Sequence, residues 1–560
     1  MVKKVKKKKK RGLGMGATSR AREQSPLRPK HVEKMPPCRD RCPSGNRIRE
    51  FVRSIAQAER LGKSTEDALE EAWYIYTETS PFPAVCGRVC PAPCESECNR
   101  KELEGPVGIN KIERAIGDFG IERNLELKRL TEEKLTQRVA IVGSGPSGLS
   151  CAYQLARRGY GVTIFEAEDK PGGMLRWGIP DYRLPPSVLD AEIQKILDLG
   201  VELRCGVKVG RDLPLDELRN SYDAVYVALG AQQGMRLGVE GEDAANVFSG
   251  IEFLNRFHHG ETIDLGNPPA VLVVGGGDTA IDAARICRRL GADVTILYRR
   301  TRKEMPAIDQ EVEEALEEGI RIEFLAAPTG LKKDGDRVTA VRCMRMELGE
   351  PDASGRRRPI PVEGSEFEVP ATAVISAISQ RPDFGGFEPL IEGKSWVQVD
   401  DQGATALDGV WAGGDVISLD LVTTAIGHGR RAAEGIDRRL LGKAAAETDH
   451  MEVIRTDRMR LDHYEKTEPL QPAVRPVDDR LRSIDVEVNL GLSREQVVAE
   501  SRRCMSCGYC FDCEKCWMYC QDQAIDKPLE KGVLYTFKME NCTGCKKCAE
   551  ECPCGFIEMH

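Results

Sequence analysis

The sequence predicts an α/β protein whose middle carries largely parallel sheets, with cysteine-bearing segments before and after it. Two observations lead to this fold class. From about residue 137, short apolar runs such as RVAIVG, VTIFEA, AVLVVGGG and DVTILYRR alternate with helix-like segments, as strands and helices do in α/β folds. The 21 cysteines, in contrast, gather near the two ends of the 560-residue chain.

Composition and charge exclude several classes of protein. The chain is 41% hydrophobic and 30% charged, which is typical of a soluble globular protein, and no run of about 18 apolar residues predicts a transmembrane helix. The start, MVKKVKKKKKRGLGMG, has no apolar stretch after its basic residues, so we expect no secretory signal. The net charge is −8, and the first eleven residues carry +8, so the acidic remainder argues against nucleic-acid binding. We expect residues 1–30 to form a disordered basic tail, with contact to an acidic partner or a membrane surface as the alternative.

The cysteines are spaced for metal clusters rather than for disulfides. Six lie from Cys38 to Cys98 and eleven from Cys504 to Cys554, mostly three or four residues apart, in a chain without a secretory signal. We therefore expect a reducing, cytoplasmic compartment. The remaining four are most simply buried apolar residues: Cys151, Cys205, Cys287 and Cys343.

Residues 31–130 predict a helical domain that carries the first cysteine group. Between the cysteines, IREFVRSIAQAERL and STEDALEEAWYIYTE have the apolar spacing of helices, and Ser64-x-x-Asp67 opens the second as a capping box.

The segment RVAIVGSGPSGLSCAYQLARRGYGVTIFEAE predicts a dinucleotide site. A strand leads into Gly143-x-Gly145-x-x-Gly148, a helix follows, and a second strand ends at Glu166. The glycines allow a tight turn and the close approach of a pyrophosphate, and the carboxylate accepts hydrogen bonds from a ribose. The alternative is a glycine-rich turn without a ligand.

The segment AVLVVGGGDTAIDAARICRRLGADVTILYRR repeats this plan as Gly275-x-Gly277-x-x-Ala280. Its second strand ends in Arg299-Arg300, where a carboxylate would repel a 2′-phosphate and guanidinium groups would pair with it. This favours NADP over NAD. The alternative is two exposed arginines on a loop.

A third segment, GVWAGGDVISLDLVTTAIGHGRRAA, indicates that the two nucleotides are a flavin and a nicotinamide nucleotide. A strand delivers Asp415, which can contact the flavin's ribityl or pyrophosphate region, and a helix begins near Thr423 and Thr424. This segment returns to the first domain. We expect FAD-binding domain parts at 131–250 and 386–440, with the NAD(P)-binding domain, 251–385, inserted between them.

Residues 441–495 contain several prolines and no regular apolar runs, and we expect a linker there. Residues 496–560 contain two copies of the bacterial ferredoxin run, in which the fourth cysteine ligates the other cluster. One [4Fe-4S] cluster would take Cys510, Cys513, Cys516 and Cys552, and the other Cys542, Cys545, Cys548 and Cys520. A structural zinc site is the alternative. Gln521 stands where the run has proline, and Cys504, Cys507 and Cys554 stay unassigned.

The order of these motifs, including GSGPSGLSCAYQLARRGYGVTIFEAEDKPGGMLRWGIPDYRLP and YRRTRKEMPA, resembles the NADPH-dependent glutamate synthase small-subunit family, which includes part of dihydropyrimidine dehydrogenase. The resemblance covers about residues 35–440. It implies FAD contacts at Gly143, Ser144, Gly145, Pro146, Ser147, Glu166, Gly173, Met174, Arg183, Val209 and Asp415. It implies NADPH contacts at Gly276, Gly277, Asp278, Thr279, Arg299, Arg300, Ala377, Ile378 and Ser379, where the family usually has glycine at the last position.

The resemblance also implies one N-terminal [4Fe-4S] cluster on Cys42, Cys90 and Cys94, with Glu113 as a fourth ligand. The alternative for Glu113 is an exposed helix carboxylate. Family members with two clusters have two more cysteines before the position of Cys38, where this chain has HVEKMPP. Cys38 and Cys98 would then belong to a second site that is incomplete or differently ligated.

These parts predict an NAD(P)H:acceptor oxidoreductase that passes electrons between NAD(P)(H), FAD and iron–sulfur clusters. No catalytic acid–base residue is expected, because hydride transfer to flavin needs positioning. The C-terminal run is similar to that of flavoproteins that partner dissimilatory sulfite reductase in sulfur metabolism, which implies such a protein partner. The alternatives are an electron-supplying subunit of glutamate synthase, a ferredoxin:NADP oxidoreductase, or a non-enzymatic redox sensor. The sequence does not decide the direction of electron flow. It also does not decide whether the chain forms a homodimer.

Overall fold

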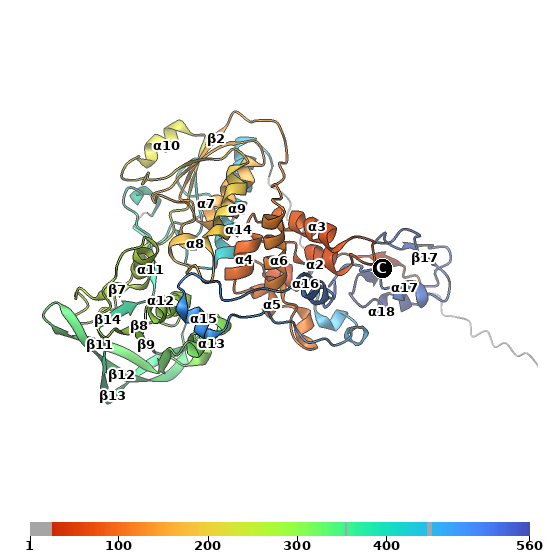
Figure 1. Ribbon diagram of the computed structural model, residues 1–560. Helices are drawn as coiled ribbons and strands as arrows, with labels where there is room; N and C mark the ends of the chain where they lie inside the picture. The colour runs from red at the N-terminus through yellow and green to blue at the C-terminus, as the bar shows by residue number, and fades with distance from the viewer. Residues whose placement is uncertain (1–24, 353–354, 392, 445–450) are drawn as a thin grey trace, which may run out of the picture. The chain divides into compact units, whose positions relative to one another are not determined.

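The computed structural model describes residues 25–352, 355–391, 393–444 and 451–560 (Figure 1). The chain forms two compact units. The large unit comprises Met35–Val453 and Glu465–Met505, and the small unit comprises Ile454–Tyr464, Ser506–His560 and the described residues before Met35. Most of the predicted basic tail lies outside the described residues. No helix in the described ranges has the length and apolarity to span a bilayer.

The large unit begins with the predicted helical domain. Its helices are α1 (Pro37–Arg41), α2 (Ile48–Ala56), α3 (Thr65–Thr77), α4 (Pro83–Val89), α5 (Pro93–Ser96) and α6 (Ile109–Glu122). The capping box at the start of α3 is confirmed, because the Ser64 side chain accepts a hydrogen bond from the Asp67 backbone N–H at 3.0 Å.

Helices α4 and α6 cross in backbone contact. A Cβ on Gly87 would lie 2.2 Å from the Arg114 nitrogen, and a Cβ on Gly117 would lie 2.1 Å from the Ala84 nitrogen. Two glycines, one on each helix, therefore allow this close crossing. The start of α4 is held by Glu192, whose carboxylate accepts hydrogen bonds from the N–H groups of Ala84 and Val85 at 2.8 and 3.0 Å.

The first sheet has the strand order β16-β5-β2-β3-β4, and all its pairs are parallel. The strands are β2 (Arg138–Val142), β3 (Gly161–Phe165), β4 (Glu202–Arg204), β5 (Ala224–Val227) and β16 (Val410–Ala412). The helices associated with it are α7 (Pro146–Ala156), α8 (Met174–Trp177), α9 (Pro186–Leu197), α10 (Leu215–Ser221) and α14 (Val422–Leu440). A Cβ on Gly429 would lie 2.1 Å from the Ser147 carbonyl oxygen, so α14 packs directly on α7.

The second sheet has the order β10-β9-β8-β14-β7 and is also parallel. Its strands are β7 (Val247–Ser249), β8 (Ala270–Val274), β9 (Asp293–Tyr298), β10 (Arg321–Phe324) and β14 (Ala373–Ser376). Its helices are α11 (Gly250–His258), α12 (Asp278–Arg289) and α13 (Asp309–Glu317). All these strands fall between β5 and β16 in the chain, so the chain leaves the first sheet after β5 and returns to it at β16.

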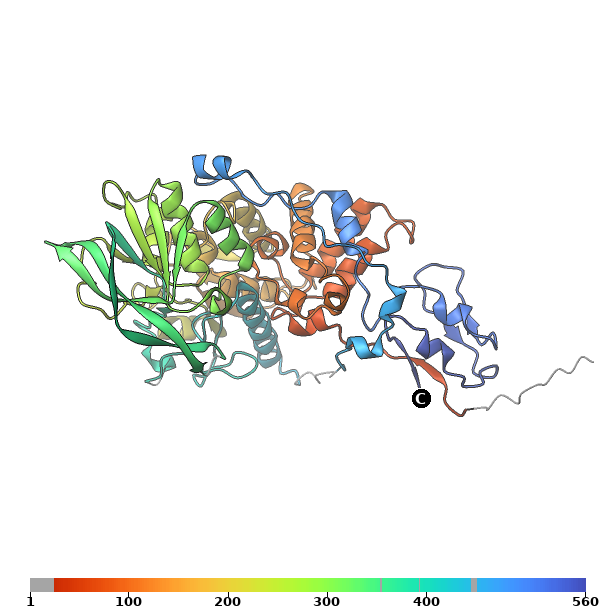
Figure 2. The same cartoon turned by 90° about the horizontal axis from the view of Figure 1, so that it is seen from below.

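An antiparallel layer of three long strands accompanies the second sheet (Figure 2, green to teal arrows). These strands are β11 (Ala326–Asp334), β12 (Arg337–Pro351) and β13 (Arg357–Pro370). The short apolar runs of the sequence did not reveal this layer, because β13 is exposed along most of its length.

The segment predicted as a linker, residues 441–495, contains α15 (Val477–Arg482), and α16 (Arg494–Ser501) begins at its end. Both helices lie within Glu465–Met505, where the chain packs on the large unit. The N–H of Val488 donates to the Tyr182 carbonyl at 3.0 Å, and the Val488 side chain is buried. This segment lacks regular apolar runs because single residues, rather than a helix face, make the contacts.

The small unit contains the predicted cysteine-rich module. Its helices α17 (Lys515–Met518) and α18 (Lys547–Glu550) each follow a left-handed residue, Glu514 at φ 66° and Lys546 at φ 67°, so the two cysteine runs share one backbone plan. Strands β17 (Ile525–Asp526) and β18 (Thr536–Phe537) pair, as do β1 (Pro29–His31) and β19 (Ile557–Met559). Residues 29–30 therefore belong to this module and not to the predicted tail.

Candidate functional site

A cavity of about 500 Å³ opens at the carboxyl ends of the first sheet's strands. Parallel sheets bind ligands at this edge. Most of the predicted flavin residues line it, namely Gly143, Ser144, Gly145, Pro146, Ser147, Glu166, Gly173, Met174, Val209 and Asp415. Sequence reasoning missed other lining residues, including Trp177, Lys208, Arg211, Gln232 and Asn255.

The glycine turn between β2 and α7 leaves room for a phosphate. Gly143 has φ 96°, and a Cβ there would lie 2.5 Å from the Ala228 carbonyl oxygen. A Cβ on Gly148 would lie 2.0 Å from the Gly143 oxygen, so both positions require glycine. A Cβ on Gly145 would meet nothing within 4 Å, and it faces the open cavity at the start of α7. This cradle fits a pyrophosphate at a helix N-terminus.

Glu166 ends β3 at the cavity wall, where its position is fixed by the backbone. Its carboxylate accepts hydrogen bonds from the N–H groups of Ser144 and Glu168, each at 2.9 Å, and from the Ser144 hydroxyl. The side chain is buried, yet the residue lines the cavity. A carboxylate in this position suits the ribose hydroxyls of a dinucleotide.

The far side of the cavity is built by the turn into α14. Burial raises the pKa of Asp415 to about 6. Gly414 donates its N–H to Nδ1 of His428 at 3.2 Å, and Ala425 lines the cavity from the first turn of α14. Thr423 and Thr424, predicted beside the flavin, are not among the lining residues; the Thr423 hydroxyl instead lies 3.8 Å from the Cys90 sulfur.

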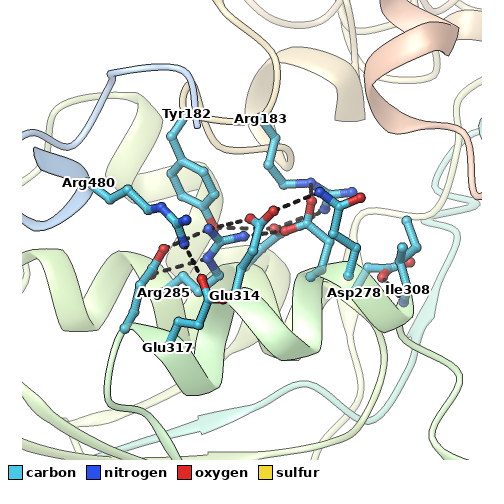
Figure 3. Close-up of polar contacts among 12 residues, drawn as sticks. Tyr182, Arg183, Asp278, Arg285, Ile308, Glu314, Glu317 and Arg480 are labelled. Carbon is cyan, nitrogen blue, oxygen red and sulfur yellow. Dashed lines mark hydrogen bonds and ion pairs between the residues drawn. The ribbon is translucent and has the colours of Figure 1, made fainter. Parts of the chain in front are cut away.

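Arg183, another predicted flavin residue, is not among the residues that line the cavity and instead joins a buried ionic network (Figure 3). Its guanidinium contacts both carboxylate oxygens of Asp282 in α12, at 2.8 and 3.0 Å, and Glu311 in α13 at 3.1 Å. Burial opposes the charge of Arg183, but Asp282 and Glu311 raise its pKa above the ordinary value. Arg183 therefore ties the first domain to the second.

The second glycine turn forms a similar cradle at the start of α12. A Cβ on Gly275 would lie 2.3 Å from the Ala377 oxygen, and one on Gly276 would lie 2.4 Å from the Tyr298 ring. A Cβ on Gly277 meets nothing within 4 Å, so this position is open for a phosphate. Asp278 begins α12 and accepts a hydrogen bond from the Ile308 N–H at 3.0 Å; Thr279 follows it in the first turn.

The two predicted arginines have different surroundings. Arg299 is exposed, whereas Arg300 is buried and pairs with Asp352 at 2.7 Å. Burial raises the pKa of Tyr298, and the positive charges of Arg300, Arg356 and Arg299 act against that rise. Three guanidinium groups therefore lie near enough to Tyr298 for their charges to act on its hydroxyl. Arg356 comes from the β12–β13 connection, and no local pattern in the sequence pointed to it.

The remaining predicted nucleotide residues follow β14. Ala377 packs on Gly275, Ile378 is exposed, and the exposed Ser379 accepts a backbone hydrogen bond from Met235 at 3.0 Å. The strand places all three at the carboxyl edge of the second sheet, near the glycine turn.

Glu113 lies near four of the N-terminal cysteines, namely Cys42, Cys86, Cys90 and Cys94. Its side chain is 4% exposed, so the alternative of an exposed helix carboxylate is wrong. Burial, with a smaller contribution from Glu95, raises the pKa of Glu113 to about 8. Burial is the largest cause of the raised pKa of Cys42, Cys90 and Cys94, and the negative charge of Glu113 is the second largest.

The cysteine loops are positioned by the α4–α6 crossing and by α14. Cys90 ends α4, and its sulfur accepts the Ala92 N–H at 3.4 Å. A Cβ on Gly427 of α14 would lie 2.3 Å from the carbonyl oxygen of Pro43, the residue after Cys42. Three thiols and one carboxyl therefore meet beside the helix that borders the first cavity, which fits a cluster ligand set.

Cys38 and Cys98 lie next to this set. The charge of Cys38 contributes to the raised pKa of Cys94, and Cys98 caps the short helix η1 (Asn99–Glu102). Cys86, which was not assigned as a ligand, is fully buried beside Tyr76.

Charge interactions show which cysteines of the small unit lie near one another. Burial raises the pKa of Cys516, and Cys552, Cys510 and Cys513 raise it further, so these four thiols are neighbours. Burial likewise raises the pKa of Cys548 to about 12, with Cys542, Cys545 and Cys520 adding to it. Backbone N–H groups point at the sulfurs, including Asp512 to Cys510 at 3.4 Å and Ala524 to Cys520 at 3.2 Å.

The unassigned Cys554 is buried beside one of these sets. Its sulfur lies 3.8 Å from that of Cys552. A role for Cys554 as a donor to a ligand thiolate is compatible with this contact.

Two nucleotide cradles and these cysteine sets define an iron–sulfur flavoprotein. The family model of pyridine nucleotide-disulphide oxidoreductases matches residues 137–429, and the model of dihydropyrimidine dehydrogenase domain II, 4Fe-4S cluster, matches residues 28–125. The chain belongs to the pyridine nucleotide-disulphide oxidoreductase family, and it is an oxidoreductase that uses FAD, NADP and a [4Fe-4S] cluster.

Characterised relatives cover most of the chain. It is 40% identical over 513 residues to the NADPH-Fe(3+) oxidoreductase subunit beta of Geobacter sulfurreducens, spanning 84% of this chain and 75% of that protein. It is 38% identical over 427 residues to the glutamate synthase [NADPH] small chain of Escherichia coli, spanning 72% and 88%. The resemblance to the glutamate synthase small-subunit family is confirmed. FprA of Mycobacterium tuberculosis in complex with NADPH matches with TM-score 0.48 and 19% identity, over 56% of this chain and 88% of that one.

Proposed function

We propose that this chain is the electron-transfer subunit of an NADPH-dependent oxidoreductase, and that it exchanges electrons with a partner protein through its iron–sulfur clusters. One observation carries this proposal. The first turn of α14 contacts the Cys90 thiol through Thr423 and lines the first cavity through Ala425. A flavin in that cavity and a cluster on Cys90 would be separated by a single helical turn.

FAD held in this cavity would supply two-electron chemistry toward NADPH and one-electron chemistry toward the clusters. The residues of this chain supply position rather than acid–base chemistry. Glu166 would hold the flavin nucleotide at its ribose, and the open edge at Gly145 would receive its pyrophosphate. The arginines around Tyr298 would select the 2′-phosphate of NADPH.

Two [4Fe-4S] clusters in the small unit complete the proposed route. One would be held by the four cysteines around Cys516, and the other by the four cysteines around Cys548. The inserted nucleotide-binding domain and this ferredoxin-type module are parts of the same proposal. Among the described residues of the module there is no nucleotide cradle, so we assign it the exchange of electrons with the partner.

The relatives support a partner of the glutamate synthase type more than dissimilatory sulfite reductase. Those named above are a small chain and a beta subunit, so each works within a larger enzyme by its printed name. The sulfite reductase partner implied by the C-terminal run stays a prediction, as do the ferredoxin:NADP oxidoreductase and redox-sensor alternatives.

Anaerobic rapid mixing of the full chain with NADPH tests this proposal. Flavin absorbance should bleach first and cluster absorbance should follow, and electrons should then reach an added partner. The large subunit of glutamate synthase and dissimilatory sulfite reductase would be compared as acceptors. A Cys548→Ala variant should reduce a small dye at the normal rate but deliver electrons to the partner more slowly. Flavin that NADPH leaves oxidised would rule out the proposal.

A further inference from the structure

Cys38 and Cys98 are two cysteines of the large unit that the predicted N-terminal cluster does not use. Neither belongs to the Glu113 set, and the sequence before Cys38 contains no further cysteine. A [4Fe-4S] cluster is commonly held by four thiolates. Cys504 also belongs to the large unit, has no place in the ligand sets described above and comes three residues after the end of α16 at Ser501.

The chain around Cys504 is fixed beside the segment that follows Cys98. Arg100, two residues after Cys98, donates to the carbonyl oxygen of Arg503 at 3.1 Å, and that carbonyl is bonded to the Cys504 nitrogen. Arg503 in turn donates to the carbonyl oxygens of Gly105 and Pro106, each at 2.8 Å. Residues more than 390 positions apart in the sequence are therefore joined by several direct hydrogen bonds.

These contacts are made by charged side chains inside the protein. Arg100 is 3% exposed, Arg503 is 2% exposed, and Glu500 is fully buried. Glu500 pairs with Arg503 at 2.5 Å and accepts the Gly108 N–H at 2.7 Å, while Arg100 pairs with Glu104 at 2.6 Å. Buried charges are costly unless paired and hydrogen-bonded, so this network holds one defined backbone position for residues 503–504.

The surroundings of Cys98 suit a thiolate that binds iron. The N–H groups of Val107 and Arg100 point at the Cys98 sulfur, and the Arg503 guanidinium lies nearby. Cys38 lies near Cys94, four residues before Cys98, and Cys38, Cys98 and Cys504 are all partly buried against the extended core of the large unit. Ligand binding to iron deprotonates thiols, and nearby donors stabilise the resulting charge.

We propose that Cys504 is a ligand of a second iron–sulfur site of the large unit, together with Cys38 and Cys98. A ligand from the far end of the sequence thereby replaces one of the cysteines that the chain lacks before Cys38. The site would add a relay between the Glu113 set and the protein surface, and this role rests on the proposed electron-transfer function.

Iron content and low-temperature EPR of the reduced, anaerobically purified full chain test the proposal. Wild type should contain about 16 Fe, from four clusters of four irons. Cys504→Ala should contain about 12 and should lack one EPR signal. Cys38→Ala and Cys98→Ala should lack the same signal, and the Cys38→Ala/Cys504→Ala double variant should lose no further iron. Alanine is chosen because a serine oxygen can itself bind iron.

Cys205→Ala, at a partly exposed cysteine away from all ligand sets, should keep the full iron content. Thermal melting of each variant identifies losses that come from misfolding. A Cys504→Ala protein with all wild-type signals would overturn the proposal, as would a wild type with about 12 Fe. Flavin reduction by NADPH is measured in parallel; its loss in wild type would contradict the proposed function, whereas its presence leaves the iron result to decide on Cys504.

Discussion

At the scale of single residues, the two open glycines offer a direct test of the nucleotide cradles. Gly145 and Gly277 both have free space where a Cβ would be. Gly145→Trp should fill the first cradle and abolish FAD binding, whereas Gly277→Trp should leave FAD bound and raise the KM for NADPH at least tenfold. Flavin fluorescence after denaturation measures the bound FAD. Full flavin loading of a folded Gly145→Trp protein would show that the cavity holds something else.

The exposed Arg299 tests the coenzyme preference. Arg299→Ala should weaken NADPH binding by about 1.5–3 kcal/mol and leave NADH binding almost unchanged, because only NADPH has the 2′-phosphate. Arg300 is already paired with Asp352, so its replacement also disturbs the β12–β13 connection. Steady-state KM values for both coenzymes provide the measurement. Equal changes in KM for NADPH and NADH would show that Arg299 does not bind the 2′-phosphate.

His428 makes the flavin side of the structure sensitive to acid. Burial, with the nearby charge of Arg431, lowers its pKa from 6.5 to about 4, and its neutral ring accepts the Gly414 N–H. The unfolded chain takes up this proton at a higher pH than the folded chain does. The free energy of unfolding should therefore fall as the pH decreases from about 6.5 to about 4. Below about pH 4, His428 is protonated in both states and causes no further change in that free energy.

A comparison with His428→Asn isolates this contribution, because the asparagine oxygen can still accept the Gly414 N–H but does not titrate there. Melting temperatures between pH 4 and 7.5 should fall less steeply for the variant. Parallel curves for the two proteins would contradict the assignment to His428.

The predictability of each residue depends on how local its signal is. The glycine turns and Glu166 were predicted because turn, helix and strand follow one another within about 30 residues. The contacts of Arg356, Arg183 and Cys504 were not predicted, since their neighbours come from distant segments. Arg183 lies in a motif that the resemblance assigned to flavin, yet its buried partner Asp282 belongs to the second domain.

At the scale of elements, the glycine crossing of α4 and α6 positions the N-terminal cysteines. Gly87→Ala would place a Cβ 2.2 Å from the Arg114 nitrogen, and the helices would have to separate. We expect a destabilisation of about 1–3 kcal/mol and loss of N-terminal iron, with iron in the small unit retained. Gly161→Ala, whose Cβ would lie 3.5 Å from Arg138, is the matched control and should change neither property. Iron analysis and urea titration provide both measurements.

The elements themselves were predicted unevenly, for a physical reason. The parallel strands are buried on both faces, so their sequences are apolar runs. RVAIVG, which contains β2, and AVLVVGGG, which contains β8, are examples. Strand β13 is mostly exposed and therefore polar, and residues 465–505 attach through isolated contacts such as Val488. Neither leaves a periodic pattern in the sequence.

At the scale of the whole large unit, buried ion pairs join its two nucleotide-binding domains. Arg183 precedes α9 of the first domain, whereas its partners belong to α12 and α13 of the second (Figure 3). Arg480 of α15 extends this contact by pairing with Glu317 of α13 at 2.9 Å. Hydride transfer requires the two nucleotides to be held close together and in a fixed orientation, so this junction should set the rate.

Arg183→Met should therefore affect coupling between the domains more than cofactor content. It leaves Asp282 buried without its cation, which costs about 3–5 kcal/mol of stability, and the double variant Arg183→Met/Asp282→Leu should recover most of that loss. FAD content should stay near one per chain, because Arg183 does not line the cavity. The rate of flavin bleaching by NADPH should fall at least tenfold in the single variant. Loss of FAD from a folded Arg183→Met protein would instead support direct contact between Arg183 and the flavin, as the family resemblance implied. Rapid-mixing kinetics and urea unfolding on the same preparations separate these two roles, since the ion-pair role changes the transfer rate and the contact role changes occupancy.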